Sequence, residues 1–580
     1  MAKSKLHLPH PDFLRRWAPG LAALVYAVMF ILAFPPFNQP WAILVFLVPL
    51  VKWTFALPRW RTFLWTVLGA AWLGWVGLLI WLRHIYPPWG LVGLVMLSAV
   101  LALFPLSWFA AVRWAAPKLM NAAVRNRLLG LAGLAGWWVV LDWVRGWLFT
   151  GFPWLPLAAA FWKFPILLQP IEWTGAWGIT FVIVLFNLGL VCGTGPDAET
   201  PPTSERKLWW PARFGAEIMV PVLLLLGAVL IKVIETARKP IQPDTMLRVG
   251  FVQPWTPATL KWDPAEEQKN WETVQKLTGI FALHPGNRNN VDLVLWPEAA
   301  LAVLLEGPQA TQNRAMLEQL AKNLGRPIVL GGIGEMHPPP GETVSPGIFD
   351  GVFLVRPGAG FSGDVYAKRH LVPFGEYNPL RQWLPFLGKV VPLDQDTVPG
   401  DRAVTLPLIL DSGRKIQVGP LVCYEDVFGG LARDEVKAGA DLLVVVTNDA
   451  WYGTGGGALQ HAAHSVLRAI ETRRPVVRCG NDGWSGIIDQ DGDAFEFEKV
   501  GSAMKIDWVF TTQGTSYFRG SGAANVYTYP QYSGYETFYV RFGDWFVLLS
   551  ALLAAGGVVA LKNKKTNPRP PHEAMDGNPP

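Results

Sequence analysis

The chain has few charged residues and few cysteines, and both shortages restrict its class. Charged residues make up 16% of the 580 positions, whereas 51% are hydrophobic and 30 residues are tryptophan, which is the profile of a membrane protein. Three cysteines are too few for a disulfide framework, and no C-x-x-C pair or H-E-x-x-H sequence indicates a metal site. No basic–aromatic motif accompanies the net charge of +6, so we expect no nucleic-acid partner, and we expect no cofactor.

Apolar sequence is concentrated before about Val233 and after about Phe542. Because roughly 20 apolar residues cross a bilayer, the sequence predicts seven spans before the polar stretch and one after it, near 18–34, 40–57, 62–82, 91–112, 128–148, 173–193, 214–233 and 543–561. Pro49 and Pro105 interrupt the second and fourth spans, so a kinked or re-entrant element is an alternative for one of them. These runs predict a membrane domain (1–239), a polar domain (240–541) and a final span with a tail (542–580).

Basic residues gather on one side of the expected spans. They precede the first and seventh spans and follow the second, fourth and eighth, as Lys3, Lys5, Arg15, Arg16, Arg59, Arg61, Lys118, Arg125, Arg127, Arg206, Lys207, Arg213, Lys562, Lys564 and Lys565. Since Lys and Arg mark the cytoplasmic side, we expect both termini in the cytoplasm and residues 240–540 outside. Arg83 and the group Lys232, Arg238 and Lys239 oppose this orientation.

The polar domain alternates between two kinds of pattern. Strand-like runs at 247–253, 291–296, 327–332, 350–355, 416–422, 440–447 and 475–479 alternate with helical patterns near 264–283, 309–324 and 458–473. This alternation predicts an α/β domain.

Three polar residues stand where strand-like runs end in this domain. Cys423 follows such a run directly, and Glu298 follows another after Pro297. Lys368 precedes a loop that closes on Glu376. At a sheet edge these groups would supply a thiol nucleophile, a general base and a cationic stabiliser of an oxyanion. The alternatives are that Cys423 is a buried small hydrophobe or a disulfide partner of Cys479, and that Glu298 and Lys368 are solvated surface charges.

The order and context of Glu298, Lys368 and Cys423 resemble the carbon-nitrogen hydrolase (nitrilase) superfamily, and in particular its apolipoprotein N-acyltransferase branch. The resemblance spans nearly the whole chain and rests on the segments Gly151–Trp154, Gln253–Pro254, Lys261–Trp262, Leu371–Tyr377, Thr447–Gly453, Arg468–Glu471 and Arg541–Trp545. It implies a four-layer αββα sandwich and a catalytic Glu-Lys-Cys triad. It also implies that Glu376, Tyr424 and Glu425 support the site and that Trp262 and Trp451 help bind substrate.

Three positions depart from the pattern of this branch. Glu298 is followed by Ala299-Ala300 instead of a hydroxyl residue, Asp350 stands where an asparagine is expected, and Cys479 replaces a small or hydroxyl residue. None of these departures touches the expected triad.

The resemblance implies a reaction and its partners. A phospholipid would present an acyl ester to Cys423, Glu298 would take the thiol proton, and Lys368 with the N–H after the cysteine would stabilise the oxyanion. The acceptor of the thioester would be the α-amino group of the diacylglyceryl-cysteine of an apolipoprotein. We therefore expect a monomeric acyltransferase in the bacterial inner membrane, with its catalytic domain on the outer face.

Two other functions remain as alternatives. A membrane-tethered amidase acting on a small amide would use the same triad, although it would give no reason for seven preceding spans. A transporter with an inactive appended domain would carry charges in its spans, and apart from Asp142 and Arg145 these are scarce.

An apolar segment follows Glu376 closely. Its large residues are Leu380, Trp383, Leu384, Phe386 and Leu387, interrupted by two prolines and a glycine. We expect them to form a lid that dips into the membrane interface over Cys423 and binds substrate. The alternative is a loop packed on the core of the domain.

Overall fold

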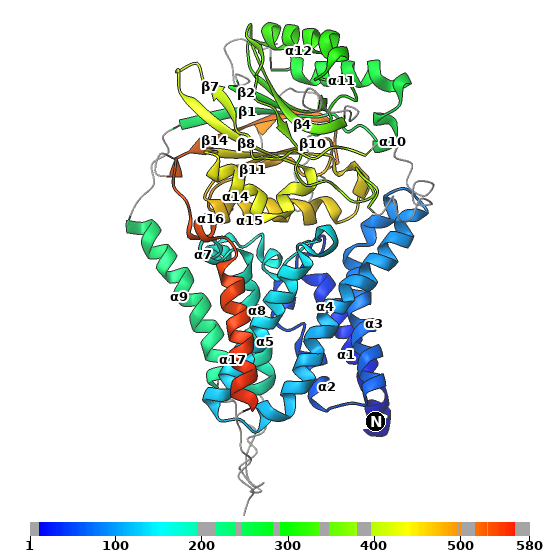
Figure 1. The fold of residues 1–580 in the computed structure, drawn as a ribbon, viewed down its shortest axis with the longest axis vertical. Coiled ribbons are helices and arrows are strands. Elements are labelled where there is room, and N and C mark those ends of the chain that lie inside the picture. The colour runs from blue at the N-terminus through cyan, green and yellow to red at the C-terminus, as the bar shows by residue number, and fades with distance from the viewer. Residues whose placement is uncertain are drawn as a thin grey trace, which may run out of the picture.

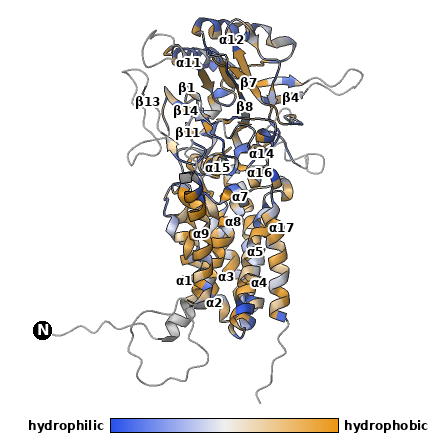
Figure 2. Cartoon of the chain, turned by 90° about the vertical axis from the view of Figure 1, so that its left-hand side faces the viewer, coloured by the Kyte–Doolittle hydropathy of each residue, from blue (hydrophilic) through white to orange (hydrophobic). Residues whose placement is uncertain are grey.

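The computed structural model describes residues 11–193, 215–238, 245–281, 291–336, 347–379, 396–495, 498–499, 517–529 and 532–562. These residues form a helical domain and an α/β domain that are stacked along the long axis of the molecule (Figure 1). Hydrophobic residues run along the helical domain, whereas the α/β domain is mixed (Figure 2). The division into two domains follows the hydropathy pattern of the sequence.

The helical domain brings the first part of the chain together with its last helix. Its long helices are α1 (Pro11–Ala33), α3 (Trp60–Leu78), α4 (Trp89–Met120), α5 (Val124–Arg145), α8 (Ala176–Gly193), α9 (Ala216–Arg238) and α17 (Trp545–Lys562). Short elements join them: η1 (Pro40–Leu44), α2 (Val48–Phe55), η2 (Ile80–His84), η3 (Leu148–Thr150), η4 (Leu157–Phe161), α6 (Pro165–Leu168) and α7 (Ile171–Thr174). α17 returns from the α/β domain to pack against α5 (Figure 1).

Five of the described helices are long and apolar enough to cross a membrane, namely α4, α5, α8, α17 and residues 216–235 of α9. The expected second span is wrong as a single helix, because η1 and α2 are separate and α2 has only eight residues. At 1.5 Å per residue, so short a helix cannot cross the hydrocarbon core. The broken element predicted as an alternative is therefore found there, while α4 continues through Pro105.

Small residues let α5 and α17 approach closely. A Cβ on Gly136 would strike the carbonyl group of Ser550, and one on Gly133 would lie 3.0 Å from the Cα of Gly557. In a lipid environment such close backbone approach is a main source of helix–helix stability.

The α/β domain contains two sheets. The first has the order β13-β14-β1-β2-β3-β4-β5 with β6 beside β4, and the second has the order β12-β11-β10-β9-β8-β7. The strands of the first sheet are β1 (Thr245–Gln253), β2 (Leu293–Trp296), β3 (Ile328–Met336), β4 (Gly347–Arg356), β5 (Gly360–Phe361), β6 (Tyr366–Ala367), β13 (Glu498–Lys499) and β14 (Gly520–Thr528). Those of the second are β7 (Leu406–Ile409), β8 (Lys415–Val422), β9 (Leu442–Thr447), β10 (Val476–Gly480), β11 (Gly486–Ile488) and β12 (Ala494–Phe495).

Helices cover the outer face of each sheet. α11 (Glu267–Gly279) and α12 (Thr311–Leu324) lie on the first sheet, away from the helical domain, while α14 (Gly429–Lys437) and α15 (Gly457–Thr472) lie between the second sheet and the helical domain (Figure 1). Buried aliphatic residues of both sheets, such as Leu295 and Val446, fill the space between them. The expected αββα sandwich is therefore confirmed.

One amide of α15 ties the two domains together. Gln460 is buried; its Oε1 accepts hydrogen bonds from the indole groups of Trp81 (3.0 Å) and Trp154 (2.9 Å). Its Nε2 donates to the carbonyl oxygens of Pro35 (3.0 Å) and Leu78 (2.9 Å). All four partners belong to the helical domain. Because an unmade hydrogen bond of a buried amide is costly, this side chain fixes α15 over the membrane helices.

Candidate active site

Cys423 lies at the end of β8, as its sequence context predicts. It is the first residue of η7 (Cys423–Val427), its φ is +52°, and its side chain is 7% exposed. A non-glycine residue in the left-handed region costs free energy and is found disproportionately at functional sites. The sharp turn presents the thiol at the carboxyl edge of the second sheet.

Glu298 and Lys368 come to the same place from the first sheet. Glu298 follows β2 and is buried, and Lys368 follows β6 and is fully enclosed. The Lys368 ammonium donates to Glu298 Oε1 at 3.4 Å and to the carboxylate of Glu376. Burial alone would lower the pKa of Lys368, but Glu376 and Glu298 raise it well above its usual range. Lys368 therefore stays charged, and the surface-charge alternative for Lys368 and Glu298 is wrong.

Burial and these charges determine the protonation states of Glu298 and Cys423. Burial raises the pKa of Glu298, but Lys368 and Lys261 outweigh burial and hold it below its ordinary value. Burial and the neighbouring Glu298 charge raise the pKa of the Cys423 thiol well above its usual range. At neutral pH the arrangement is thus a thiol next to an ionised carboxylate, which is what a nucleophile and its general base require.

Glu425 joins the two segments that carry Lys368 and Cys423. Its Oε2 accepts the N–H of Val422 (2.7 Å) and the hydroxyl of Tyr366 (2.8 Å). Its Oε1 accepts the main-chain N–H groups of Arg369 (2.7 Å) and His370 (3.1 Å). One buried carboxylate thereby holds the end of β8 against the Tyr366 side chain before Lys368 and the backbone directly after it.

Tyr424 connects the thiol turn to the helical domain. Its hydroxyl donates to the carbonyl of Gly151 at 3.3 Å, and its ring stacks on Phe152 and Trp154. Arg145 at the end of α5 donates to the carbonyl oxygens of Phe152 (2.7 Å) and Trp154 (2.9 Å). The loop that follows α5 is therefore held by Arg145 of that helix and packs against Tyr424, the residue after Cys423.

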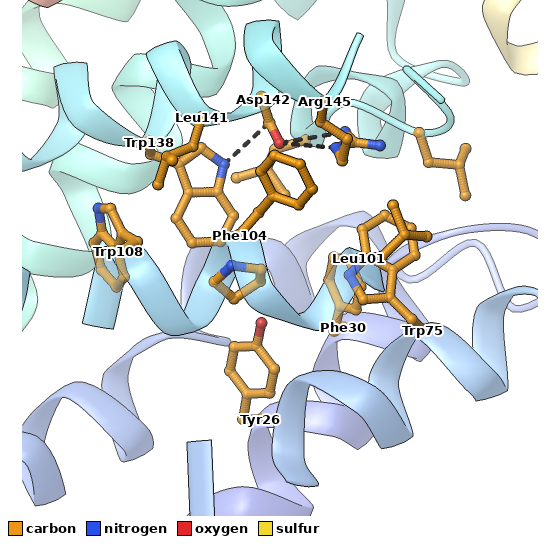
Figure 3. A pocket seen from close by; sticks show the side chains of 13 residues that line it. Tyr26, Phe30, Trp75, Leu101, Phe104, Trp108, Trp138, Leu141, Asp142 and Arg145 are labelled. Carbon is orange, nitrogen blue, oxygen red and sulfur yellow. Dashed lines mark hydrogen bonds and ion pairs between the residues drawn. The ribbon is translucent and has the colours of Figure 1, made fainter. Parts of the chain in front are cut away.

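Arg145 is itself positioned inside the helical domain. It pairs with Asp142, whose other oxygen accepts the indole N–H of Trp138 at 3.1 Å (Figure 3). These groups line an apolar pocket between α1, α3, α4 and α5, together with Tyr26, Phe30, Trp75 and Leu101. Because Asp142 and Arg145 are paired with each other and Arg145 with main-chain oxygens, their burial is explained without ion transport.

A buried charged network under Cys423 had no clear signal in the sequence. The His461 ring contacts the carbonyl oxygen of Cys423 (Nε2, 3.1 Å), Asp426 Oδ1 (Nε2, 2.8 Å) and Asp449 Oδ1 (Nδ1, 2.8 Å). Arg478 pairs with the same two carboxylates, at 2.8 and 3.1 Å. His461 lies on α15, and its hydrogen bonds support the turn at Cys423 from behind.

The predictions for the remaining residues differ in how the structure bears on them. Cys479 is a free thiol whose sulfur faces the carbonyl oxygens of Val252 and Leu295, both at 3.5 Å, so the disulfide alternative is wrong. Trp262 is 52% exposed next to Lys261, and Trp451 packs on Tyr86 with ring centroids 5.3 Å apart. Their role in substrate binding stays a prediction. The expected lid residues Leu380, Trp383, Leu384, Phe386 and Leu387 lie outside the described residues.

A carboxylate cluster around Lys368 has the composition of a cation site. Oxygens of Glu298, Asp350 and Glu376 lie within 4.8 Å of one another. The Lys368 ammonium already donates to two of these groups. Lys368 therefore supplies positive charge at the place where an ion would bind.

Comparisons with known proteins find a match for each of the two domains. A family model described as carbon-nitrogen hydrolase matches residues 248–507, and one described as apolipoprotein N-acyltransferase N-terminal domain matches residues 26–189. The chain is 31% identical to the apolipoprotein N-acyltransferase of Geobacter metallireducens, over 84% of this chain and 88% of that protein. It is 30% identical to the same-named protein of Azotobacter vinelandii, over 82% and 86% of the two chains.

A solved structure matches a smaller part of the chain. The crystal structure of an amidase from Nesterenkonia sp. is 16% identical with a TM-score of 0.34, and the match covers 54% of this chain and 99% of that one.

The contacts of Glu425 predict that its substitution slows the reaction of Cys423. In Glu425→Gln one carboxylate oxygen becomes an NH₂ group that faces N–H or O–H donors, so at least one buried donor loses its acceptor. We expect the rate of Cys423 alkylation by iodoacetamide at neutral pH to fall at least about tenfold, because Lys368 and the thiol turn lose their common anchor. Mass spectrometry of the alkylated protein measures this rate.

The matched control is Glu272→Gln on the exposed face of α11, which is expected to react like the wild type. An unchanged alkylation rate in Glu425→Gln would contradict the anchoring role.

Proposed function

The chain belongs to the apolipoprotein N-acyltransferase family, and from this premise we propose that it moves an acyl chain from a phospholipid to the N-terminal α-amino group of a diacylglyceryl-cysteine lipoprotein. The observation that carries the proposal is the convergence of Glu298, Lys368 and Cys423 on a turn that packs directly on the membrane domain. A thiol nucleophile at this boundary suits a donor whose ester group lies at the level of the lipid headgroups.

In the first half-reaction Cys423 becomes acylated. Glu298 takes the thiol proton as the sulfur attacks the ester carbonyl, and the developing oxyanion is stabilised by the Lys368 ammonium and the N–H of Tyr424. The C–O bond of the ester then breaks, and Glu298 returns the proton to the leaving glycerol oxygen. The products are a thioester on Cys423 and a lysophospholipid.

In the second half-reaction the lipoprotein amine receives the chain. The neutral α-amino group attacks the thioester, Glu298 takes a proton from the nitrogen, and the C–S bond breaks. The proton passes to the departing sulfur, so the thiol and the ionised Glu298 are regenerated together with an amide. The cycle needs no cofactor, because each proton taken by Glu298 is returned within the same half-reaction.

An amidase acting on a small soluble amide is the second candidate, since it would use the same three groups. The contacts of Tyr424 with Gly151 and of Gln460 with four groups of the helical domain favour a lipid donor. They build the thiol turn into the membrane part of the protein, and a soluble amide gives no reason for this.

The proposal predicts how the triad variants behave. In nanodiscs that contain phospholipid, a synthetic diacylglyceryl-cysteine peptide should gain one acyl chain. Glu298→Gln and Lys368→Met should slow this transfer at least about a hundredfold, the lower range for losing an acid/base or oxyanion group, and Cys423→Ala should abolish it. Mass spectrometry of the peptide measures the transfer.

Glu272→Gln, Lys276→Met and Cys192→Ala are the matched controls and should transfer at the wild-type rate. Hydrolysis of small amides without transfer from any phospholipid would favour the amidase instead.

We also propose that the α/β domain lies outside the bacterial inner membrane and both termini inside. Lys232, one of the residues that oppose this orientation, is paired with Glu172 at 2.6 Å and with Glu235 at 3.2 Å, so its charge is balanced by neighbouring carboxylates. A thiol reagent that cannot cross the membrane should label Lys276→Cys in intact spheroplasts. It should not label Asn121→Cys in the turn between α4 and α5, which lies at the opposite end of the molecule. The reverse labelling would contradict the orientation.

A further inference from the structure

Asp350 lies beside Glu298, the proposed catalytic base. It belongs to β4, where its carbonyl oxygen accepts the main-chain N–H of Lys368 at 2.8 Å. Its carboxyl group lies within 4.8 Å of the carboxyl oxygens of Glu298 and Glu376. Oδ1 of Asp350 is enclosed and has no hydrogen-bond partner among the described residues.

The charges at this place do not balance if all three carboxyl groups are ionised. Two ammonium groups face the cluster: Lys368, which donates to Glu298 and Glu376, and Lys261, which donates to the main-chain oxygen of Glu298 at 2.6 Å. They neutralise two carboxylates. A third ionised carboxylate, with one oxygen enclosed, would be a charge without compensation, which is unfavourable.

The contacts indicate which of the three groups is neutral. Glu298 receives the Lys368 ammonium, and Glu376 receives Lys368 and also the N–H of Val372 at 2.8 Å. The enclosed oxygen of Asp350 receives no donor among the described residues. Asp350, whose enclosed Oδ1 receives no donor, is the group that gains most by holding a proton of its own.

We propose that Asp350 is a neutral carboxylic acid that donates a hydrogen bond to the Glu298 carboxylate and so positions the catalytic base. The inference rests on the proposed function insofar as Glu298 is that base. Burial and the adjacent Glu298 charge raise the pKa of Asp350 well above its usual range, in agreement with this assignment. The donated bond leaves the other lone pairs of Glu298 for Lys368 and for the Cys423 proton.

The pH dependence follows with a definite sign. The charged groups that face Asp350 are Glu298, Glu376, Lys368 and Lys261. As the pH rises through the elevated pKa, Asp350 loses its proton, and two adjacent carboxylates then repel each other. The positioning is thus complete at neutral pH and is lost at alkaline pH. An asparagine at the same position donates a similar bond and cannot ionise.

Two measurements that need no lipid test the proposal. The first is the infrared spectrum, in which the wild-type minus Asp350→Asn difference should contain the carbonyl band of a protonated carboxylic acid at neutral pH. This band should disappear as the pH is raised. The second is the rate of Cys423 alkylation by iodoacetamide at neutral pH. We expect Asp350→Ala to slow it at least about tenfold, the effect of losing a hydrogen bond to a charged group, while Asp350→Asn stays within about twofold of the wild type.

The exposed Asp364→Asn serves as the control and should change neither measurement. A wild-type thermal melt of Asp350→Ala separates lost positioning from collapse of the site, and Asp350→Asn should melt in the same way. Absence of the band, or equal alkylation rates in Asp350→Ala and the wild type, would overturn the proposal. If both expected results appear while no phospholipid supports acyl transfer, the inference stands and the proposed function fails.

Discussion

The Lys368 ammonium is the charge on which the rest of the site depends. It is fully enclosed, and an isolated ammonium in such a place would be strongly unfavourable. It therefore requires carboxylates around it, and Glu298 and Glu376 meet that need from two different loops. Lys368, with Lys261, holds Glu298 ionised, and burial together with that negative charge keeps the proton on the Cys423 thiol. The protonation states of Glu298 and Cys423 thus depend on Lys368, together with Lys261 and burial.

The same site is also part of the boundary between the domains. Tyr424, the residue after Cys423, contacts the loop that Arg145 holds at the end of α5. The carbonyl of Cys423 contacts His461 on α15, and Gln460, one residue before His461, bonds to the helical domain. The strained turn at Cys423 is therefore supported from both domains. A separated α/β domain would lack part of this support.

The sequence predicted the features that depend on a few neighbouring residues. A strand that ends at Cys423, a proline before Glu298 and long apolar runs are local signals, and the structure has a turn or a helix at each. The joint action of Glu425 on Val422 and Arg369 was not predictable, because those donors lie more than fifty residues apart and meet only after the two sheets pack. The break between η1 and α2 was visible only as a proline, since hydropathy alone does not separate a broken element from a continuous span.

The central claim is that Cys423 carries the acyl chain between donor and acceptor. The most direct measurement is the intact mass of the purified protein after incubation with a phospholipid of defined acyl chain and no lipoprotein acceptor. The account predicts a mass increase of one acyl chain, removed by neutral hydroxylamine as a thioester is and absent from Cys423→Ala. No such increase with any phospholipid, or an equal increase in Cys423→Ala, would contradict it.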